Sequence, residues 1–192
     1  MPTLRTGLRP GDLGAIAHLH GTLYAAEHGL DATFEGSVAA NLGAAAIRGW
    51  PGEGEGLWVA EDDDGRLLGC IALTREDDRR GQLRWFLLRP EARGLGLGRA
   101  LLAAVVETAD RHGYEAVELV TFDALTAAAH LYRAAGFVRT EAAPKALWGR
   151  TLTIERYVRA RRARRASARA APAAARSRAP RCAAPRCRRT GA

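Results

Sequence analysis

The sequence predicts one mixed α/β domain in which helices pack against a largely antiparallel sheet. Three observations support this fold class. Apolar residues recur at helical spacing over residues 13–24, short apolar runs with strand spacing fill residues 57–88, and a glycine-rich turn at 93–98 leads into an apolar helix. The length of 192 residues suits one domain with a tail. The content of 47% hydrophobic and 26% charged residues excludes collagen-like, membrane-embedded and wholly disordered proteins.

The elements begin and end at recognisable signals. Pro10, Gly11 and Asp12 form a turn before the first helix, and residues 62–65 carry the Asp-Gly signature of a hairpin. The predicted elements are a strand at 3–9, helices from 13 to about 27 and from 34 to 49, strands at 57–61, 66–74 and 83–88, a helix at 100–112, a strand at 117–122, a helix at 126–135, and strands at 137–139 and 151–158. This order indicates mixed layers rather than alternating βαβ units.

Positive charge is concentrated at one end of the chain. The formal net charge is +8, but residues 159–192 contain twelve Arg and no Asp or Glu, so the rest of the chain is mildly acidic. This segment also lacks large apolar residues and cannot bury a core. We therefore predict a folded domain over 1–158 and a disordered tail over 159–192. The tail is a nucleic-acid arm, an inert extension or an out-of-frame product, and nucleic acid is expected to bind only through it.

The cysteines indicate a reducing compartment. Cys70 lies in an apolar run, whereas Cys182 and Cys187 lie in the tail, so the three do not form a disulfide framework. The N-terminus lacks the apolar region of a secretory signal, and no stretch approaches the roughly 20 apolar residues that span a bilayer. A cytoplasmic protein with no membrane partner is expected.

The glycine-rich turn is the most informative segment. An apolar strand at 83–88 precedes the run Arg93-Gly94-Leu95-Gly96-Leu97-Gly98, in which free backbone N–H groups at a helix start can bind phosphate. A packing role for the glycines is the alternative. The run is no Walker loop, since Arg follows its last glycine instead of Lys. It is no dinucleotide fingerprint either, because Arg99 or Leu101 occupies the third glycine position.

Two motifs together resemble a known family. Arg93-x-x-Gly96-x-Gly98, followed by Leu131-Tyr132-x-x-x-Gly136-Phe137, resembles the signature pair of the GCN5-related N-acetyltransferases, the GNAT superfamily. Residues 23–29 with Phe34-Glu35 and Trp148-Gly149 further resemble the acetyltransferase half of MarR-type regulator/acetyltransferase fusion proteins. The resemblance spans residues 4–158. It implies a twisted sheet of six to seven strands, mixed but mostly antiparallel, splayed between strands four and five and flanked by about four helices.

The resemblance implies an enzyme that transfers an acetyl group from acetyl-CoA to a primary amine of a small molecule or protein, directly in a ternary complex. It implies that the diphosphate of coenzyme A binds the glycine-rich turn and that the pantetheine arm pairs with the strand edge before it. A homodimer is common among similar proteins. The residues expected to bind the cofactor are Phe86, Leu87, Leu88, Arg93, Gly94, Leu95, Gly96, Leu97, Gly98 and Arg99.

Catalytic roles follow from the same resemblance. A backbone N–H near Leu87 or Leu88 is expected to stabilise an oxyanion, and Tyr132 matches the family tyrosine that acts as general acid. The general base stays open, because Gln82 stands where some members carry Glu and cannot accept a proton. A water chain is the alternative. The residues expected to order it or to recognise the amine are Glu27, His28, Glu35 and Asp123.

Other residues receive simpler interpretations. His18 and His20 are read as helix-surface or core residues, and no metal site is predicted because no Cys or carboxylate stands at ligand spacing. Loops at 49–56 and 142–149, with the first two helices, should frame the acceptor pocket. Its mix of Trp50, Trp148, Glu27 and Glu35 favours a cationic amine with some apolar body. Leu125 replaces an Asn that touches the cofactor in many relatives. With the missing Glu, this substitution leaves a non-catalytic acyl-CoA-binding sensor or scaffold as the alternative function.

Overall fold

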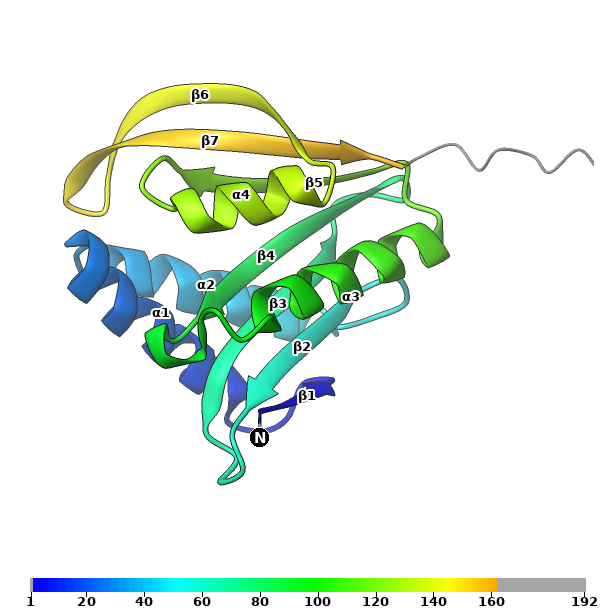
Figure 1. The fold of residues 1–192 in the computed structure, drawn as a ribbon, viewed down its shortest axis with the longest axis horizontal. Helices are drawn as coiled ribbons and strands as arrows, with labels where there is room; N and C mark the ends of the chain where they lie inside the picture. Colours follow the sequence, from blue (N-terminus) through cyan, green and yellow to red (C-terminus); the bar gives the residue numbers. More distant parts are fainter. Residues whose placement is uncertain (1, 162–192) are drawn as a thin grey trace, which may run out of the picture. The chain divides into compact units, whose positions relative to one another are not determined.

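The computed structural model describes residues 2–161, which form one seven-stranded sheet with helices on both faces (Figure 1). The strand order is β1-β2-β3-β4-β5-β7-β6, and every neighbouring pair is antiparallel except β4 and β5. The predicted mixed, mostly antiparallel sheet is confirmed. The elements are β1 (Thr3–Thr6), α1 (Asp12–His28), α2 (Ala32–Ile47), β2 (Gly56–Glu61), β3 (Leu67–Arg75), β4 (Arg80–Leu88), the 3₁₀ helix η1 (Pro90–Ala92), α3 (Leu97–His112), β5 (Ala116–Phe122), α4 (Thr126–Ala134), β6 (Val138–Leu147) and β7 (Arg150–Ala160).

Each face of the sheet has its own hydrophobic core, because successive side chains of a strand point to opposite faces. On β3, Cys70 and Ala72 are buried with residues of α1 and α2, whereas Ile71 and Leu73 are buried with residues of α3 and α4. All four side chains are inaccessible to solvent. The two helical layers therefore fix the centre of the sheet, from which β4 leads into the glycine-rich turn.

The sheet splits between β4 and β5. These strands pair in parallel only where Arg80–Gln82 lies beside Ala116–Glu118, and in Figure 1 they then separate towards their carboxyl ends. The β3–β4 register shifts at Cys70–Ala72, and Trp85 in β4 has a φ of 48°, which marks a β-bulge. Because a bulge bends its strand, it turns β4 away from β5 and opens the edge where a ligand can lie.

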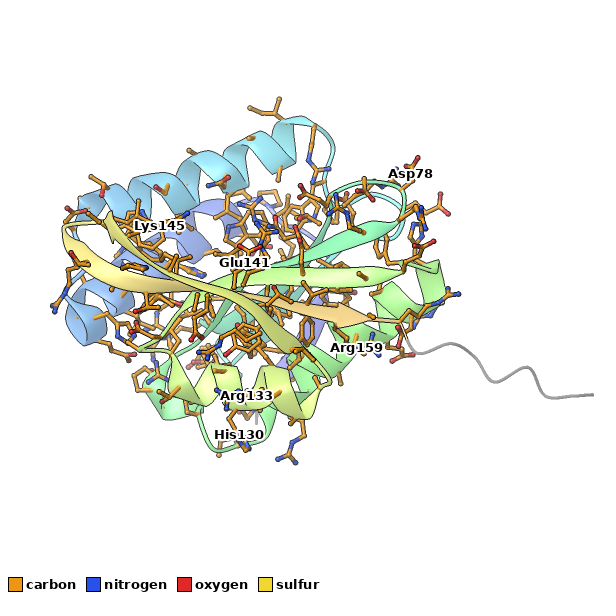
Figure 2. The ribbon with its side chains drawn as sticks, turned by 90° about the horizontal axis from the view of Figure 1, so that it is seen from above. Asp78, His130, Arg133, Glu141, Lys145 and Arg159 are labelled. Carbon is orange, nitrogen blue, oxygen red and sulfur yellow. The ribbon has the colours of Figure 1, made fainter. Side chains whose placement is uncertain are left out.

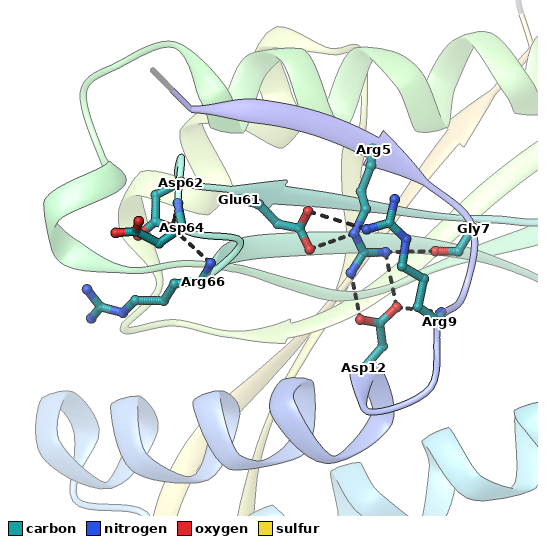
Figure 3. A network of polar contacts seen from close by, with 8 residues as sticks. All are labelled: Arg5, Gly7, Arg9, Asp12, Glu61, Asp62, Asp64 and Arg66. Carbon is teal, nitrogen blue, oxygen red and sulfur yellow. Dashed lines mark hydrogen bonds and ion pairs between the residues drawn. The ribbon is translucent and has the colours of Figure 1, made fainter.

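Polar contacts fix the start of α1 (Figure 3). The Arg5 guanidinium donates to Asp12 Oδ1 at 2.6 Å and to Glu61 Oε1 at 2.6 Å. These side chains are only 11–16% exposed, so the charge-assisted hydrogen bonds are weakly screened by solvent. The contact ties α1, which carries residues of the site, to β1 and β2.

A second ion pair joins the two halves of the split sheet. Arg159 on β7 donates to both carboxylate oxygens of Asp110 on α3 at 2.9 Å, and its Nε donates to the Ala135 carbonyl at 3.2 Å. Arg159 and Ala160, assigned to the tail by the sequence analysis, thus continue β7. The remainder of the predicted tail, 162–192, lies outside the described residues. No helix within 2–161 is long and apolar enough to cross a membrane.

The predicted loop at 142–149 is wrong for most of its length. Residues through Leu147 belong to β6, which pairs with β7 along its whole extent. The segment lacks both β-branched residues and apolar alternation, so its sequence carries no strand signal. It forms a strand because β7 offers a free edge, and Pro144 is tolerated there since an edge strand needs fewer donors.

Candidate active site between the splayed strands

The glycine-rich turn has the backbone that its sequence predicts. Gly94 has a φ of 77° and Gly96 a φ of 81°, in a region that residues with a side chain rarely adopt. Gly96 is the N-cap of α3 and supplies no capping side chain. At Gly98, a Cβ atom would lie 3.2 Å from side-chain atoms of both Leu88 and Leu131. Glycine therefore allows α3 to begin close against β4 and α4.

Six consecutive amides of this turn are free to bind a ligand. The N–H groups from Gly94 to Arg99 donate to no acceptor within residues 2–161, whereas Arg93 N donates to Pro90 O and Ala100 N to Gly96 O, both at 3.1 Å. The partial positive charge at the start of α3 adds to these donors. The turn is thus a ready anion site built entirely from the main chain.

A cleft of about 640 Å³ lies against this turn, within the roughly 300–1,000 Å³ typical of ligand pockets. Eight of the ten predicted cofactor residues line it. Leu95 does not, being 62% exposed, and the Leu97 side chain instead packs against a small cluster around Ala92. The lining residues from the prediction are Phe86, Leu87, Leu88, Arg93, Gly94, Gly96, Gly98 and Arg99.

The two arginines of the turn differ in what they contact. Arg93 donates to both carboxylate oxygens of Glu27 at 2.8 and 2.9 Å, and its Nε donates to Leu88 O at 3.1 Å. It therefore anchors the turn to α1. Arg99 lines the cleft and has no ion pair or hydrogen bond with residues 2–161, so its guanidinium is available to a phosphate.

The open edge of β4 faces the same cleft. Arg89 N donates to Leu68 O on β3 at 2.8 Å. Because amides in an antiparallel ladder alternate in direction, Leu87 also points its N–H to β3, and Leu88 points its N–H to the opening. Of the two amides named in the prediction, that of Leu88 is the one that points to the opening.

A second cleft, of about 380 Å³, continues beyond the first. Tyr24, Phe86 and Leu125 line both clefts and form an apolar neck between them. The second cleft receives side chains from α1, α2, β4, β5, α4 and the β6–β7 hairpin. Its polar lining residues are His20, Ser37, Asn41, Gln82, Arg84, Thr121, Tyr132 and Lys145.

His20, expected on a helix surface or in the core, is buried and also lines the second cleft. It is 3% exposed and stacks on Tyr24 with ring centroids 5.8 Å apart. Its Nδ1 lies 2.9 Å from Ile16 O, so Nδ1 carries the proton and Nε2 keeps its lone pair. Burial lowers its pKa to about 4 and keeps it neutral. The four-residue spacing of Ile16, His20 and Tyr24 was the signal that could have placed it.

Tyr132 lies on the wall of the second cleft. Its ring is 4% exposed and packs among Phe86, Phe137 and Tyr157, with ring centroids about 6 Å apart. Burial raises the pKa of its phenol far above the ordinary value, which keeps the proton on the oxygen.

The four predicted acceptor residues lie away from the second cleft. Glu27 and His28 line the first cleft, and Glu27 is held by Arg93. Glu35 packs its carboxylate against α1 at Gly21, and Asp123 is exposed; neither lines either cleft. Within the described part of the chain, no group of three or more His, Cys, Asp and Glu side chains is arranged to hold a metal ion.

Comparisons with known proteins agree with this geometry. Residues 24–137 match the model of the acetyltransferase (GNAT) family. The chain belongs to the GNAT family. It is an N-acetyltransferase of this family. An uncharacterized N-acetyltransferase of Schizosaccharomyces pombe is 34% identical over 119 residues, which cover 62% of this chain and 72% of that protein.

Other relatives match over a smaller share of their length. The mycothiol acetyltransferase of Propionibacterium freudenreichii is 38% identical over 43% of this GNAT chain and 27% of its own. An acetyltransferase from Salmonella typhimurium, solved with acetyl-CoA, has a TM-score of 0.62 and 22% identity, and covers 91% of this chain and 99% of that one. A structure described as a phosphinothricin N-acetyltransferase has a TM-score of 0.64 and 19% identity, covering 85% and 100%. These structures confirm the predicted GNAT fold.

Proposed function

We propose that this protein transfers the acetyl group of acetyl-CoA directly to a primary amine, with donor and acceptor bound together in the two clefts. The observation that carries the proposal is the junction of the clefts at Tyr24, Phe86 and Leu125, beside the open edge of β4. A donor in one cleft and an amine in the other would meet at this neck. Direct transfer needs no intermediate site on the protein.

The first cleft fits acetyl-CoA. The six free amides of the turn, with Arg99, would hold the diphosphate, and the edge of β4 at 86–88 would hold the pantetheine arm. When bound, acetyl-CoA supplies an activated thioester carbonyl. Leu125 fills the neck with an apolar side chain, so the arm depends there on main-chain donors and packing.

Three groups of the chain would then act on the reacting atoms. The Leu88 N–H points to the opening and can stabilise negative charge on a carbonyl oxygen. Tyr132 keeps its proton until the leaving sulfur becomes a thiolate, and then donates it. Neutral His20 can accept a hydrogen bond from the amine through Nε2. The proton that the nitrogen loses on acylation would leave through water, because Gln82 cannot take it up.

Several finer predictions accompany this proposal. Relatives named as N-acetylaspartate synthetase and as spermidine N-acetyltransferase carry names that indicate acid-bearing and cationic acceptors respectively. Because the two names indicate different acceptor classes, we infer the acceptor class from the side chains of the second cleft. A small molecule or a protein amine, a homodimer, a cytoplasmic location and a MarR-type relation stay predictions.

A thiol-release screen tests the proposal. The purified full chain is incubated with acetyl-CoA and a panel of amino acids, diamines, aminoglycosides and peptides, and free coenzyme A is measured against an amine-free blank. Calorimetry with acetyl-CoA is run in parallel. We expect micromolar binding and amine-dependent release. Binding without release for any amine would support the sensor alternative, and absence of binding would refute both.

A further inference from the structure

We propose that the second cleft binds a small acceptor that carries an oxyanion, either a carboxylate or a phosphoryl group, beside its amine. This inference rests on the proposed function, because it names the acceptor class of the same reaction. It reverses the cationic acceptor that Glu27 and Glu35 suggested from the sequence.

The charge of the second cleft carries the inference. Its charged lining residues are Arg84 on β4 and Lys145 on β6, and no Asp or Glu within residues 2–161 lines it. Figure 2 labels Lys145 near the β6–β7 hairpin. A polyamine would add positive charge to this lining without a carboxylate to balance it, whereas an oxyanion would be attracted by both residues.

Carboxylates on the adjoining strands already have partners. Glu155 on β7 accepts from Arg139 at 2.5 Å and from the Tyr157 hydroxyl at 3.0 Å. Glu118 on β5 accepts from Arg156 at 3.0 Å. Both are buried and held in these contacts, so they do not offset the charge of the cleft.

Arg84 has no partner of its own. Its guanidinium lies 4.9 Å from the centroid of the Trp85 ring, and it makes no ion pair or hydrogen bond with residues 2–161. Burial lowers its pKa, while Glu76 and Arg48 act on it only electrostatically and in opposite directions. A partly desolvated guanidinium without a partner is unfavourable. Its planar set of donors matches the two oxygens of a carboxylate or phosphoryl group.

The arrangement also fits the size of a small molecule. Arg84 and Phe86 lie on either side of the bulged Trp85 in β4, and both line the second cleft. Phe86 lines the neck, where the amine must arrive, so one small acceptor can reach both places. Arg93 cannot compete for the oxyanion, because Glu27 and the Leu88 carbonyl already occupy it.

Matched acceptors test the inference. Alanine, alaninamide, 1-aminoethylphosphonate and putrescine are compared by kcat/KM for thiol release. The same series is run with wild type, Arg84→Gln, Arg84→Lys, Lys145→Gln and, as a control, Arg111→Gln. Arg111 pairs with Glu107 on the surface of α3, outside both clefts. Longer amino acids and aminophosphonates, each with its uncharged analogue, extend the panel.

We expect acid-bearing amines to exceed their uncharged analogues at least tenfold, and the carboxylate and phosphonate arms to show which oxyanion is preferred. Arg84→Gln should lower this ratio ten- to a hundredfold, with a smaller loss for Lys145→Gln, partial retention for Arg84→Lys and none for Arg111→Gln. Equal rates, a preference for putrescine, or a ratio insensitive to Arg84→Gln would overturn the inference and leave the acetyltransferase proposal intact.

A binding measurement separates the two failures. If no amine releases thiol, the proposed function is refuted, but the oxyanion site is still open to test. The acid-bearing amines are then titrated calorimetrically into the CoA-saturated protein. Binding that Arg84→Gln removes would still support the oxyanion site. Absence of binding by wild type would overturn it.

Discussion

The two clefts recognise their ligands by different means, although they share a neck. The first is built from consecutive main-chain amides at 94–99, and its arginine at position 93 is neutralised by Glu27. The second is built from side chains of seven separate elements and leaves the Arg84 guanidinium without an ion pair or hydrogen bond to residues 2–161. A backbone site depends on local conformation, whereas a side-chain site depends on how distant elements meet.

This difference has a functional consequence. The donor cleft can tolerate many side-chain changes but few changes in φ, so it suits a ligand common to a whole family. The acceptor cleft can change its specificity through single side chains without disturbing the turn. Mutations in the two regions should therefore separate into effects on acetyl-CoA, effects on the acceptor and effects on turnover at the neck.

The largest effect is expected at Tyr132, on the wall of the second cleft. Tyr132→Phe removes the proposed proton donor while keeping the ring, so kcat should fall about 100- to 1,000-fold with little change in the KM for acetyl-CoA. Tyr114→Phe is the matched control, because Tyr114 is equally buried in the same core and lines neither cleft. Steady-state kinetics decide: an unchanged kcat for Tyr132→Phe would remove the acid role.

The next effect belongs to the donor cleft alone. Gly96→Val and Gly65→Val both force a side chain into a positive φ, 81° and 75°, with open space around the Cβ. Each should cost about 1–2 kcal/mol of stability. Only Gly96→Val should also raise the KM for acetyl-CoA, at least thirtyfold, because it displaces the free amides. Equal KM values in the two variants would contradict the amide site.

The contrast between the clefts also explains what the sequence could predict. The glycine turn, its strand and the Tyr132 helix are contiguous motifs, so local pattern could bring eight of the ten predicted residues to the first cleft. The acceptor cleft joins residues as distant as His20 and Lys145, whose meeting depends on packing that no local pattern encodes. β6 was missed for the same reason, since pairing with β7 and not its own composition makes it a strand.

His20 gives a pH test of the acceptor cleft. Its folded pKa of about 4 lies below the ordinary 6.5, so the unfolded chain binds a proton that the folded chain rejects. Stability is therefore full above pH 6.5 and falls as the pH drops to about 4, by about 3 kcal/mol in total. His20→Gln should remove this dependence, while His18→Gln, on the exposed face of α1, should retain it. Calorimetric melting between pH 4 and 6.5 measures the stability of each variant. If stability falls with pH equally in His20→Gln and His18→Gln, the group that titrates is not His20.

The smallest effect should come from the ion pair between Arg159 on β7 and Asp110 on α3. Arg159→Met breaks the pair with Asp110 and should lower the free energy of unfolding by about 1–3 kcal/mol. Because this pair lines neither cleft, the variant should leave the ratio of acid-bearing to uncharged acceptors unchanged. Two truncations sharpen the point: ending the chain at Val158 should cause a similar loss of stability, whereas ending it at Arg161 should not. A changed acceptor ratio in Arg159→Met would show that the second cleft depends on how the halves of the sheet are joined, and not on Arg84 alone.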